Sequence, residues 1–139
     1  MNSYHWSQLS PGLQHSFEVE LTGAMIRSFL RLSGDNNPLH TSKTFAAQAG
    51  FRDVVAHGML TASLYSRLVG VYLPGRYCLL HGIDVEFVGP VFSGDRLLVQ
   101  GEIFHLNEAY RRIEVKASIT NGGNELVSRA KIRVGLHEY

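Results

Sequence analysis

The residues best suited to acid–base chemistry lie in two neighbouring stretches, SGDNNPLH and AHGML. In the first stretch, Asp35 and His40 flank a short loop that contains Pro38, which biases the preceding residue toward extended backbone. A rigid loop of this length can turn a carboxylate and an imidazole toward one water molecule, and such a pair is suited to general acid–base catalysis. The same residues also suit a plain helix-ending turn, so spacing alone leaves both interpretations open.

The second stretch places His57 and Gly58 at the start of an apolar segment. If a helix begins there, the N–H of Gly58 has no helix carbonyl to bond, and the positive helix end favours a developing oxyanion. A glycine also lets a carbonyl oxygen approach closely. His57 is open to a structural or a catalytic interpretation. Asp35, His40 and His57 match no recognised metal-ligand spacing, and we predict no metal.

These residues need a scaffold, and the sequence predicts a buried helix at its centre. Residues 58–73 are apolar almost all round, so a helix there should be buried on most sides, and Pro74 and Gly75 would end it. Ser66 lies about two turns beyond Gly58 and could bond into the site. Alternation predicts a strand at 15–21, and capping signals predict helices from Thr22 to Gly34 and over 42–48 with Ser42 as cap.

The second half of the chain is rich in β-branched and aromatic residues and is divided by turn residues. Apolar and polar residues alternate within it, as in antiparallel strands with one buried face. The order of strand, helices and then long strands predicts an α+β fold, in which one antiparallel sheet wraps the helix at 58–73. We expect one domain over residues 1–139. The predicted strands cover residues 77–88, 95–106, 110–120 and 125–136.

Composition narrows the classes of function. A formal net charge of +1 with 18% charged residues gives no polybasic signature for nucleic acid or anionic lipid, so neither partner is expected. Cys78 is the only cysteine, which excludes an intrachain disulfide. The most apolar segment is interrupted by Arg67 and is too short to span a bilayer. No signal peptide is evident, and we expect a cytoplasmic protein.

Three motifs in order, D-x-N-P-x-H, H-G-M and P-V-x-x-G-D, closely resemble those of the (R)-specific enoyl-CoA hydratase or MaoC-like dehydratase family. The resemblance covers roughly residues 21–134. It implies a hot-dog fold, with a long central helix wrapped by an antiparallel sheet, and a homodimer with a continuous sheet across its interface. It also implies hydration of trans-2-enoyl-CoA to (R)-3-hydroxyacyl-CoA, and the reverse dehydration.

The resemblance also implies a role for individual residues. Asp35 and His40 would hold the reacting water, and the N–H of Gly58 would bind the thioester oxygen. Asn37 would fix the loop and Ser66 would orient Asp35. The resemblance implies no metal, flavin or nicotinamide cofactor. Coenzyme A arrives as part of the substrate. Leu64 and Val69 are expected in the wall of the acyl tunnel, and Arg67 departs from an otherwise apolar helix.

Three alternatives keep the same fold and change the function. The chain could be a dehydratase for acyl groups carried by acyl carrier protein, or for polyketide or sugar-linked acyl intermediates. It could be a hot-dog acyl-CoA thioesterase, although the D-x-N-P-x-H loop favours hydration. It could also be a non-catalytic acyl-CoA-binding domain, which would be expected if Asp35 or His40 were lost, and both are present.

Overall fold

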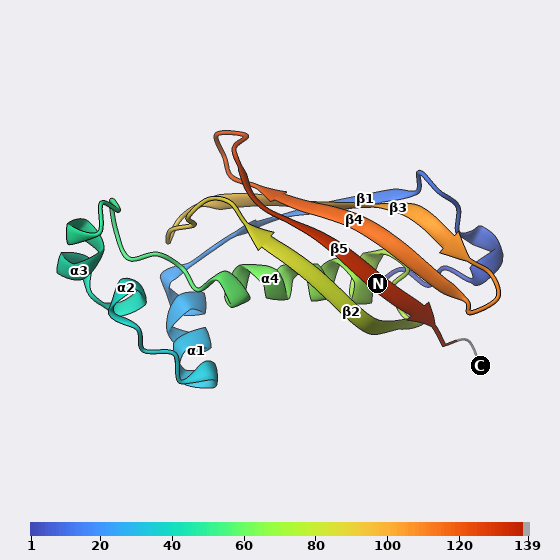
Figure 1. Cartoon of the computed structure of the whole chain (residues 1–139), viewed down its shortest axis with the longest axis horizontal. Coiled ribbons are helices and arrows are strands. Elements are labelled where there is room, and N and C mark those ends of the chain that lie inside the picture. The colour runs from blue at the N-terminus through green and yellow to red at the C-terminus, as the bar shows by residue number, and fades with distance from the viewer. Residues whose placement is uncertain (138–139) are drawn as a thin grey trace.

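A computed structural model describes residues 1–137, in which one antiparallel sheet wraps a central helix (Figure 1). The strands lie in the order β1-β3-β4-β5-β2, so β1 and β2 form the two edges. This arrangement confirms the α+β class and the hot-dog fold. No helix within the described residues is long and apolar enough to cross a membrane. The strands are β1 (Gln14–Glu20), β2 (Cys78–Phe87), β3 (Arg96–Asn107), β4 (Arg112–Thr120) and β5 (Leu126–Leu136).

The central helix lies close to its predicted bounds and has two parts, α4 (Gly58–Arg67) and the π-helical segment η2 (Leu68–Tyr72). Its buried face packs against the sheet, as the apolar composition requires. The opposite side differs from the prediction, because a stripe along the helix is exposed to solvent. The stripe consists of Met59, which is 65% exposed, with Ser63, Ser66 and Arg67.

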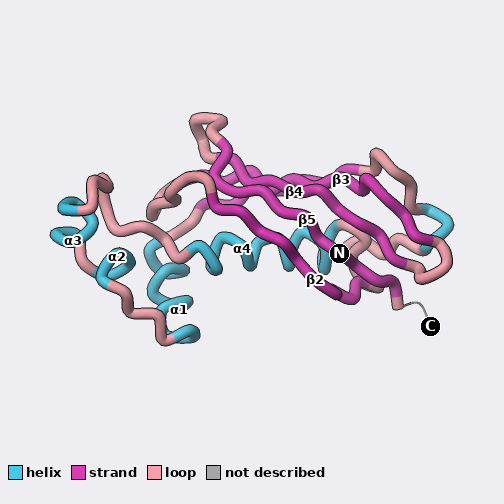
Figure 2. Tube along the Cα trace, in the orientation of Figure 1, coloured by secondary structure: helices cyan, strands magenta, loops and turns pink. Residues whose placement is uncertain are grey.

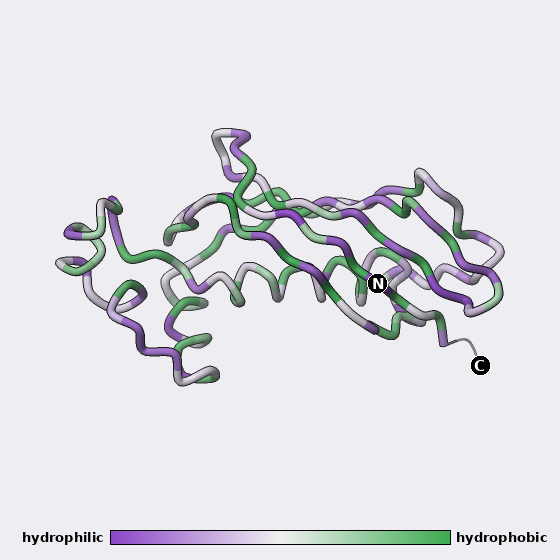
Figure 3. The backbone as a smooth tube through the Cα atoms, in the orientation of Figure 1, coloured by the Kyte–Doolittle hydropathy of each residue, from purple (hydrophilic) through white to green (hydrophobic). Residues whose placement is uncertain are grey.

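Alternation of side chains turns one face of the sheet toward α4. In β4, Ile113, Val115 and Ala117 are buried, whereas Lys116 is exposed. Figure 3 shows the alternation of hydrophobic and hydrophilic residues along the strands. A glycine on β3 lets the helix come close, because a Cβ on Gly101 would lie 2.7 Å from Cδ2 of Leu68. The sheet and the central helix therefore share one hydrophobic core.

Three short helices extend beyond the end of the sheet and carry the D-x-N-P-x-H motif (Figures 1 and 2). As predicted, Thr22 caps the first helix by accepting the N–H of Met25 at 3.2 Å, and Gly34 ends it with a φ of 73°. Ser42 caps the third helix as predicted. The helices are α1 (Gly23–Ser33), α2 (Pro38–Thr41) and α3 (Lys43–Gln48).

Two short elements were not predicted. Residues 35–40 were expected to be loop throughout, but α2 begins at Pro38, because the side chain of Asn37 accepts the N–H of Leu39 and a proline suits the first helical position. The 3-10 helix η1 (Trp6–Gln8) also lacked a sequence signal that we recognised. The return from α3 to α4 is attached to the sheet end, where the N–H of Ala56 donates to the carbonyl of Val91 at 2.7 Å.

Candidate active site

His40 lies on α2, with one ring nitrogen held by a hydrogen bond and the other facing Asp35. Its Nδ1 lies 2.7 Å from the backbone oxygen of Val55, and a carbonyl oxygen only accepts, so Nδ1 carries the hydrogen. In the neutral ring, Nε2 therefore keeps a free lone pair, and it lies 3.8 Å from Oδ2 of Asp35. This distance is too long for a direct hydrogen bond and suits two groups bridged by one water. The tautomer makes Nε2 of His40 a proton acceptor.

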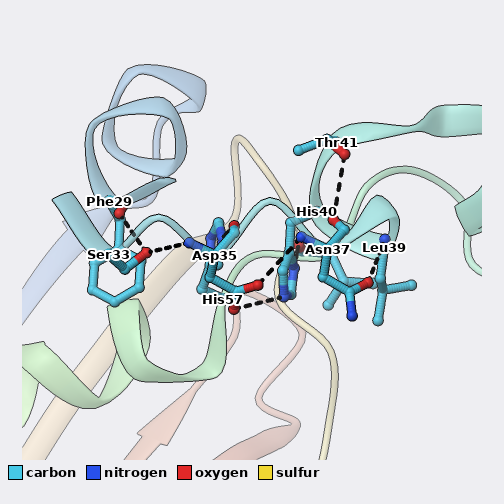
Figure 4. A network of polar contacts seen from close by, with 9 residues as sticks. Phe29, Ser33, Asp35, Asn37, Leu39, His40, Thr41 and His57 are labelled. Atoms are coloured by element: carbon cyan, nitrogen blue, oxygen red, sulfur yellow. Dashed lines mark hydrogen bonds and ion pairs between the residues drawn. The ribbon is translucent and has the colours of Figure 1, made fainter. Parts of the chain in front are cut away.

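Asp35 is held by a series of bonds between side chains and backbone (Figure 4). Its N–H donates to Oγ of Ser33 at 3.2 Å, and its own Oδ1 accepts the N–H of Asn37 at 3.2 Å. Asn37 in turn accepts the N–H of Leu39 at 2.9 Å. One carboxylate oxygen thus stabilises the turn, while the other faces His40. The Asp35 side chain is 51% exposed and that of His40 is 13% exposed, so the pair lies at a water-accessible edge.

Gly58 is the first residue of α4, so helix geometry provides no carbonyl for its N–H. The side chain of Phe87, at the end of β2, covers the Cα of this glycine. A Cβ at position 58 would lie 3.2 to 3.3 Å from three carbons of the Phe87 ring. From the sequence, this glycine was explained by the close approach of a substrate oxygen. The structure adds a second reason, because the Phe87 ring packs against the same position.

His57 is the residue whose role the sequence left open, and it lies at the centre of the site. It is 1% exposed, and its Nε2 lies 2.9 Å from the backbone oxygen of Asp35. Its ring stacks on that of His40 with centroids 3.9 Å apart and is flanked by Phe29 at 5.1 Å. Its Nδ1 is buried and has no hydrogen-bond partner. The motif H-G-M contained this residue but gave no signal for these contacts.

Asp35, His40 and His57 each have a potential metal-ligand atom, and these three atoms lie within 4.8 Å of one another. The two imidazole rings stack with centroids 3.9 Å apart and planes 30° apart, so their in-plane lone pairs lie in two separate layers. A tetrahedral zinc ion requires lone pairs that converge on one point. The stacked arrangement fits a metal ion poorly and suits proton transfer at His40.

The remaining predicted site residues lie along the central helix. Ser66 is exposed and lies eight residues beyond Gly58, about 12 Å along the helix axis from the end of α4 that contacts the Asp35 loop. Leu64 and Val69 are buried against the sheet. The guanidinium of Arg67 lies 4.3 Å from the ring centroid of Phe17, on an exposed side of the helix. Within one chain, the structure brings together the loop residues and the start of α4.

Comparison with known proteins shows the family to which the chain belongs. The family described as "MaoC like domain" matches residues 8–123. The chain is also 42% identical over 100 residues to an (R)-specific enoyl-CoA hydratase of Aeromonas caviae, and the match covers 72% of this chain and 75% of the relative. The chain belongs to the MaoC-like dehydratase family.

Further MaoC-like relatives show the range of substrates and confirm the fold. A mitochondrial 3-hydroxyacyl-[acyl-carrier-protein] dehydratase of Arabidopsis thaliana is 33% identical over 104 residues, which cover 73% of this chain and 61% of the relative. A solved structure of an (R)-hydratase from A. caviae involved in PHA biosynthesis superposes with a TM-score of 0.88 and 33% identity, covering 93% of this chain and 98% of that one. The chain is accordingly a MaoC-like hydratase or dehydratase, a hydro-lyase that acts on acyl thioesters.

Proposed function

We propose that this MaoC-like enzyme hydrates trans-2-enoyl-CoA to (R)-3-hydroxyacyl-CoA and catalyses the reverse dehydration. The observation that carries the proposal is the pairing of His40 with Asp35. Nε2 of His40 and a carboxylate oxygen of Asp35 lie 3.8 Å apart, and both residues contact His57, which directly precedes the first residue of α4. This arrangement offers two acceptors for the hydrogens of one water and one donor for a thioester oxygen.

The proposed reaction gives a role to each of the three groups. A water that donates to Asp35 and His40 attacks the β-carbon, and its proton passes to Nε2 of His40. The electrons of the C2–C3 double bond move toward the thioester, whose oxygen gains charge and accepts the N–H of Gly58. The proton, or an equivalent one, then returns to the α-carbon on the same face. The net change is addition of one water, and no cofactor is needed.

Both catalytic effects are needed because water is a poor nucleophile. General base assistance typically contributes about 10²–10⁴-fold in rate. Loss of one oxyanion donor typically costs about 10²–10³-fold. The geometry at His40 supports the first effect, and the unpaired position of Gly58 at the start of α4 supports the second.

The acyl carrier is proposed to be coenzyme A. The supporting observation is that the relative at 42% identity is named for enoyl-CoA, whereas the relative named for acyl carrier protein is 33% identical. A carrier-protein thioester is the second candidate, since both relatives share the family. We place the reaction in the cytoplasm, because the single Cys78 is in keeping with a reducing compartment.

A homodimer that pairs β2 with the β2 of a second copy is part of the proposal. As an edge strand, β2 has unpaired backbone groups on one side, and such edges are usually protected. Leu79 and Phe87 on this strand are 48% and 47% exposed, and Leu80 and Val88 are also exposed. Because Ser66 is about 12 Å along α4 from Gly58, Ser66 of the partner subunit is the copy proposed to orient Asp35.

The first experiment follows the loss of the conjugated enoyl-thioester absorbance with crotonyl-CoA and purified protein. Asp35→Asn and His40→Ala should each lower kcat by about 10²-fold or more while circular dichroism stays unchanged. His105→Ala changes an exposed histidine on β3 and should keep wild-type activity. Chiral analysis of the product should give the (R) isomer.

Three further results would overturn or redirect parts of the proposal. Full activity in both folded variants would mean that the site is wrong. Wild-type protein that ignores enoyl-CoA of every chain length but hydrates crotonyl-acyl carrier protein would establish the second candidate. Light scattering at assay concentrations should give twice the chain mass, and a monomer would remove the dimer from the proposal.

A further inference from the structure

We propose that His57 is a positioning residue that holds Asp35, His40 and Gly58 in one catalytic geometry, an inference that rests on the proposed hydration reaction. His57 itself does not touch the reacting atoms. It acts through a hydrogen bond to the backbone of Asp35, a ring stack on His40 and the peptide that leads into Gly58.

The hydrogen bond to Asp35 fixes the chemical form of His57. A backbone carbonyl only accepts, so Nε2 of His57 carries the hydrogen and Nδ1 is left as a bare acceptor. A charged ring would bury a second N–H without an acceptor, because Nδ1 has no partner and the residue is 1% exposed. His57 is therefore neutral and serves as a donor to the Asp35 loop. Buried polar atoms without a partner are rare in native proteins, and this one lies in the catalytic cluster.

The ring stack fixes the plane of the His40 imidazole. His57 lies between Phe29 of α1 and His40 of α2, with centroid distances of 5.1 and 3.9 Å (Figure 4). The carbonyl of Val55 then fixes the rotation of the His40 ring within that plane, through the 2.7 Å bond at Nδ1. Together these contacts leave the His40 Nε2 lone pair directed toward Asp35.

The backbone of His57 connects this pair to the proposed oxyanion donor. The carbonyl of His57 accepts the N–H groups of Leu60 and Thr61, at 3.0 and 3.3 Å, so the residue sets the first turn of α4. The bond from its side chain to Asp35 joins residues 22 positions apart. A displacement of His57 would therefore move the water-binding pair relative to the N–H of Gly58.

Two substitutions separate the hydrogen bond from the stack. His57→Phe keeps a ring between Phe29 and His40 and removes the donor to Asp35. His57→Gln keeps an amide donor that can reach the Asp35 carbonyl and removes the ring. Because a misplacement of about 1 Å can cost about 10²-fold, kcat should fall by about 10²-fold in His57→Phe, with KM close to wild type. His57→Gln should recover about 10-fold of that loss.

A matched control tests whether any lost buried hydrogen bond has the same effect. Tyr65, further along α4, shares a buried 2.8 Å hydrogen bond with Ser128 of β5. Tyr65→Phe should lower the melting temperature and leave kcat unchanged. If His57→Phe only lowers the melting temperature and keeps wild-type kcat, His57 is structural and the inference is overturned while the hydration proposal stands.

A second measurement does not depend on activity. Nitrogen-15 NMR of imidazole-labelled wild-type protein should show His57 protonated at Nε2 and His40 at Nδ1. In His57→Phe, the amide protons of Asn37 and Leu39 should exchange faster with solvent, and His57→Gln should restore their protection. If the wild type is inactive on every thioester, the hydration proposal fails, and these signals decide the positioning role. Opposite tautomers or unchanged exchange would overturn it.

Discussion

The contact between Gly58 and Phe87 predicts how a single added methyl group should affect the reaction. In Gly58→Ala, the new Cβ would lie 3.2 Å from the nearest ring carbon, whereas carbon atoms pack at about 3.5–4.0 Å. Either the ring or the first turn of α4 must shift by roughly 0.3–0.8 Å. If a 1 Å misplacement costs about 10²-fold, a shift of about half that size predicts a loss in kcat of about 10-fold.

Stability should change little in the same variant. Alanine is favoured over glycine within a helix by up to about 1 kcal/mol, which offsets part of the steric cost. The variant therefore separates placement of the Gly58 N–H from stability of the fold.

A double-mutant cycle with Phe87→Ala tests the reasoning, using initial rates on crotonyl-CoA and thermal unfolding of each variant. Phe87→Ala removes the ring that the methyl group would meet, so the double variant should regain most of the activity lost in Gly58→Ala. A double variant no more active than Gly58→Ala would refute displacement, and would mean that the methyl group itself blocks the substrate. Wild-type kcat in Gly58→Ala would mean that the Phe87 ring moves aside without displacing the N–H of residue 58, and would also refute displacement.

Three other predictions concern metal, thiol reactivity and helix capping. Dialysis against EDTA should leave kcat unchanged; a loss that zinc restores would instead assign a metal to Asp35, His40 and His57. Burial raises the pKa of Cys78 to about 11, so its alkylation by iodoacetamide, followed by mass spectrometry, should be slow at pH 8 and accelerate about tenfold per pH unit up to that value. A fast reaction at pH 8 would contradict this burial. Thr22→Ala should lower the free energy of unfolding by about 1 kcal/mol and the melting temperature by roughly 2–4 °C, and an unchanged melting temperature would mean that the cap is unimportant.

Elements with strong local signals were predictable from the sequence. Thr22 and Gly34 bracket α1 as expected, because an N-cap side chain and a left-handed C-cap act within a few residues of the helix they end. The turn residues after each strand placed β3 to β5 within two residues of their observed bounds. The helix α2 was missed because it is only four residues long, and its cap at Asn37 was interpreted as part of a loop.

The site was predictable in its residue types and less so in its geometry. Asp35 and His40 are close in sequence, and the turn between them is fixed by local bonds that Asn37 and Pro38 make recognisable. The position of His57 depends on contacts with residues 17 and 22 positions earlier, which no local pattern specifies. The tautomer of His40 likewise depends on the carbonyl of Val55, since any residue type could supply that oxygen.

The exposed apolar residues support the proposed dimer, which sequence periodicity alone does not reveal. Met59 lies in the helix that was predicted to be buried on most sides, and Phe87 follows the apolar alternation of a strand predicted to have one buried face, yet they are 65% and 47% exposed. Leu79, also on β2, is 48% exposed. Apolar periodicity predicts that one face of an element is buried. It does not indicate whether that face is covered by the same chain or by a second one. Single exposed apolar residues are common, but here they accompany an unpaired strand edge and a helix stripe that carries Ser66. The proposed dimer would cover that edge and could supply Ser66 of the partner subunit to Asp35, so the apparent error in predicting burial is itself an argument for the second copy.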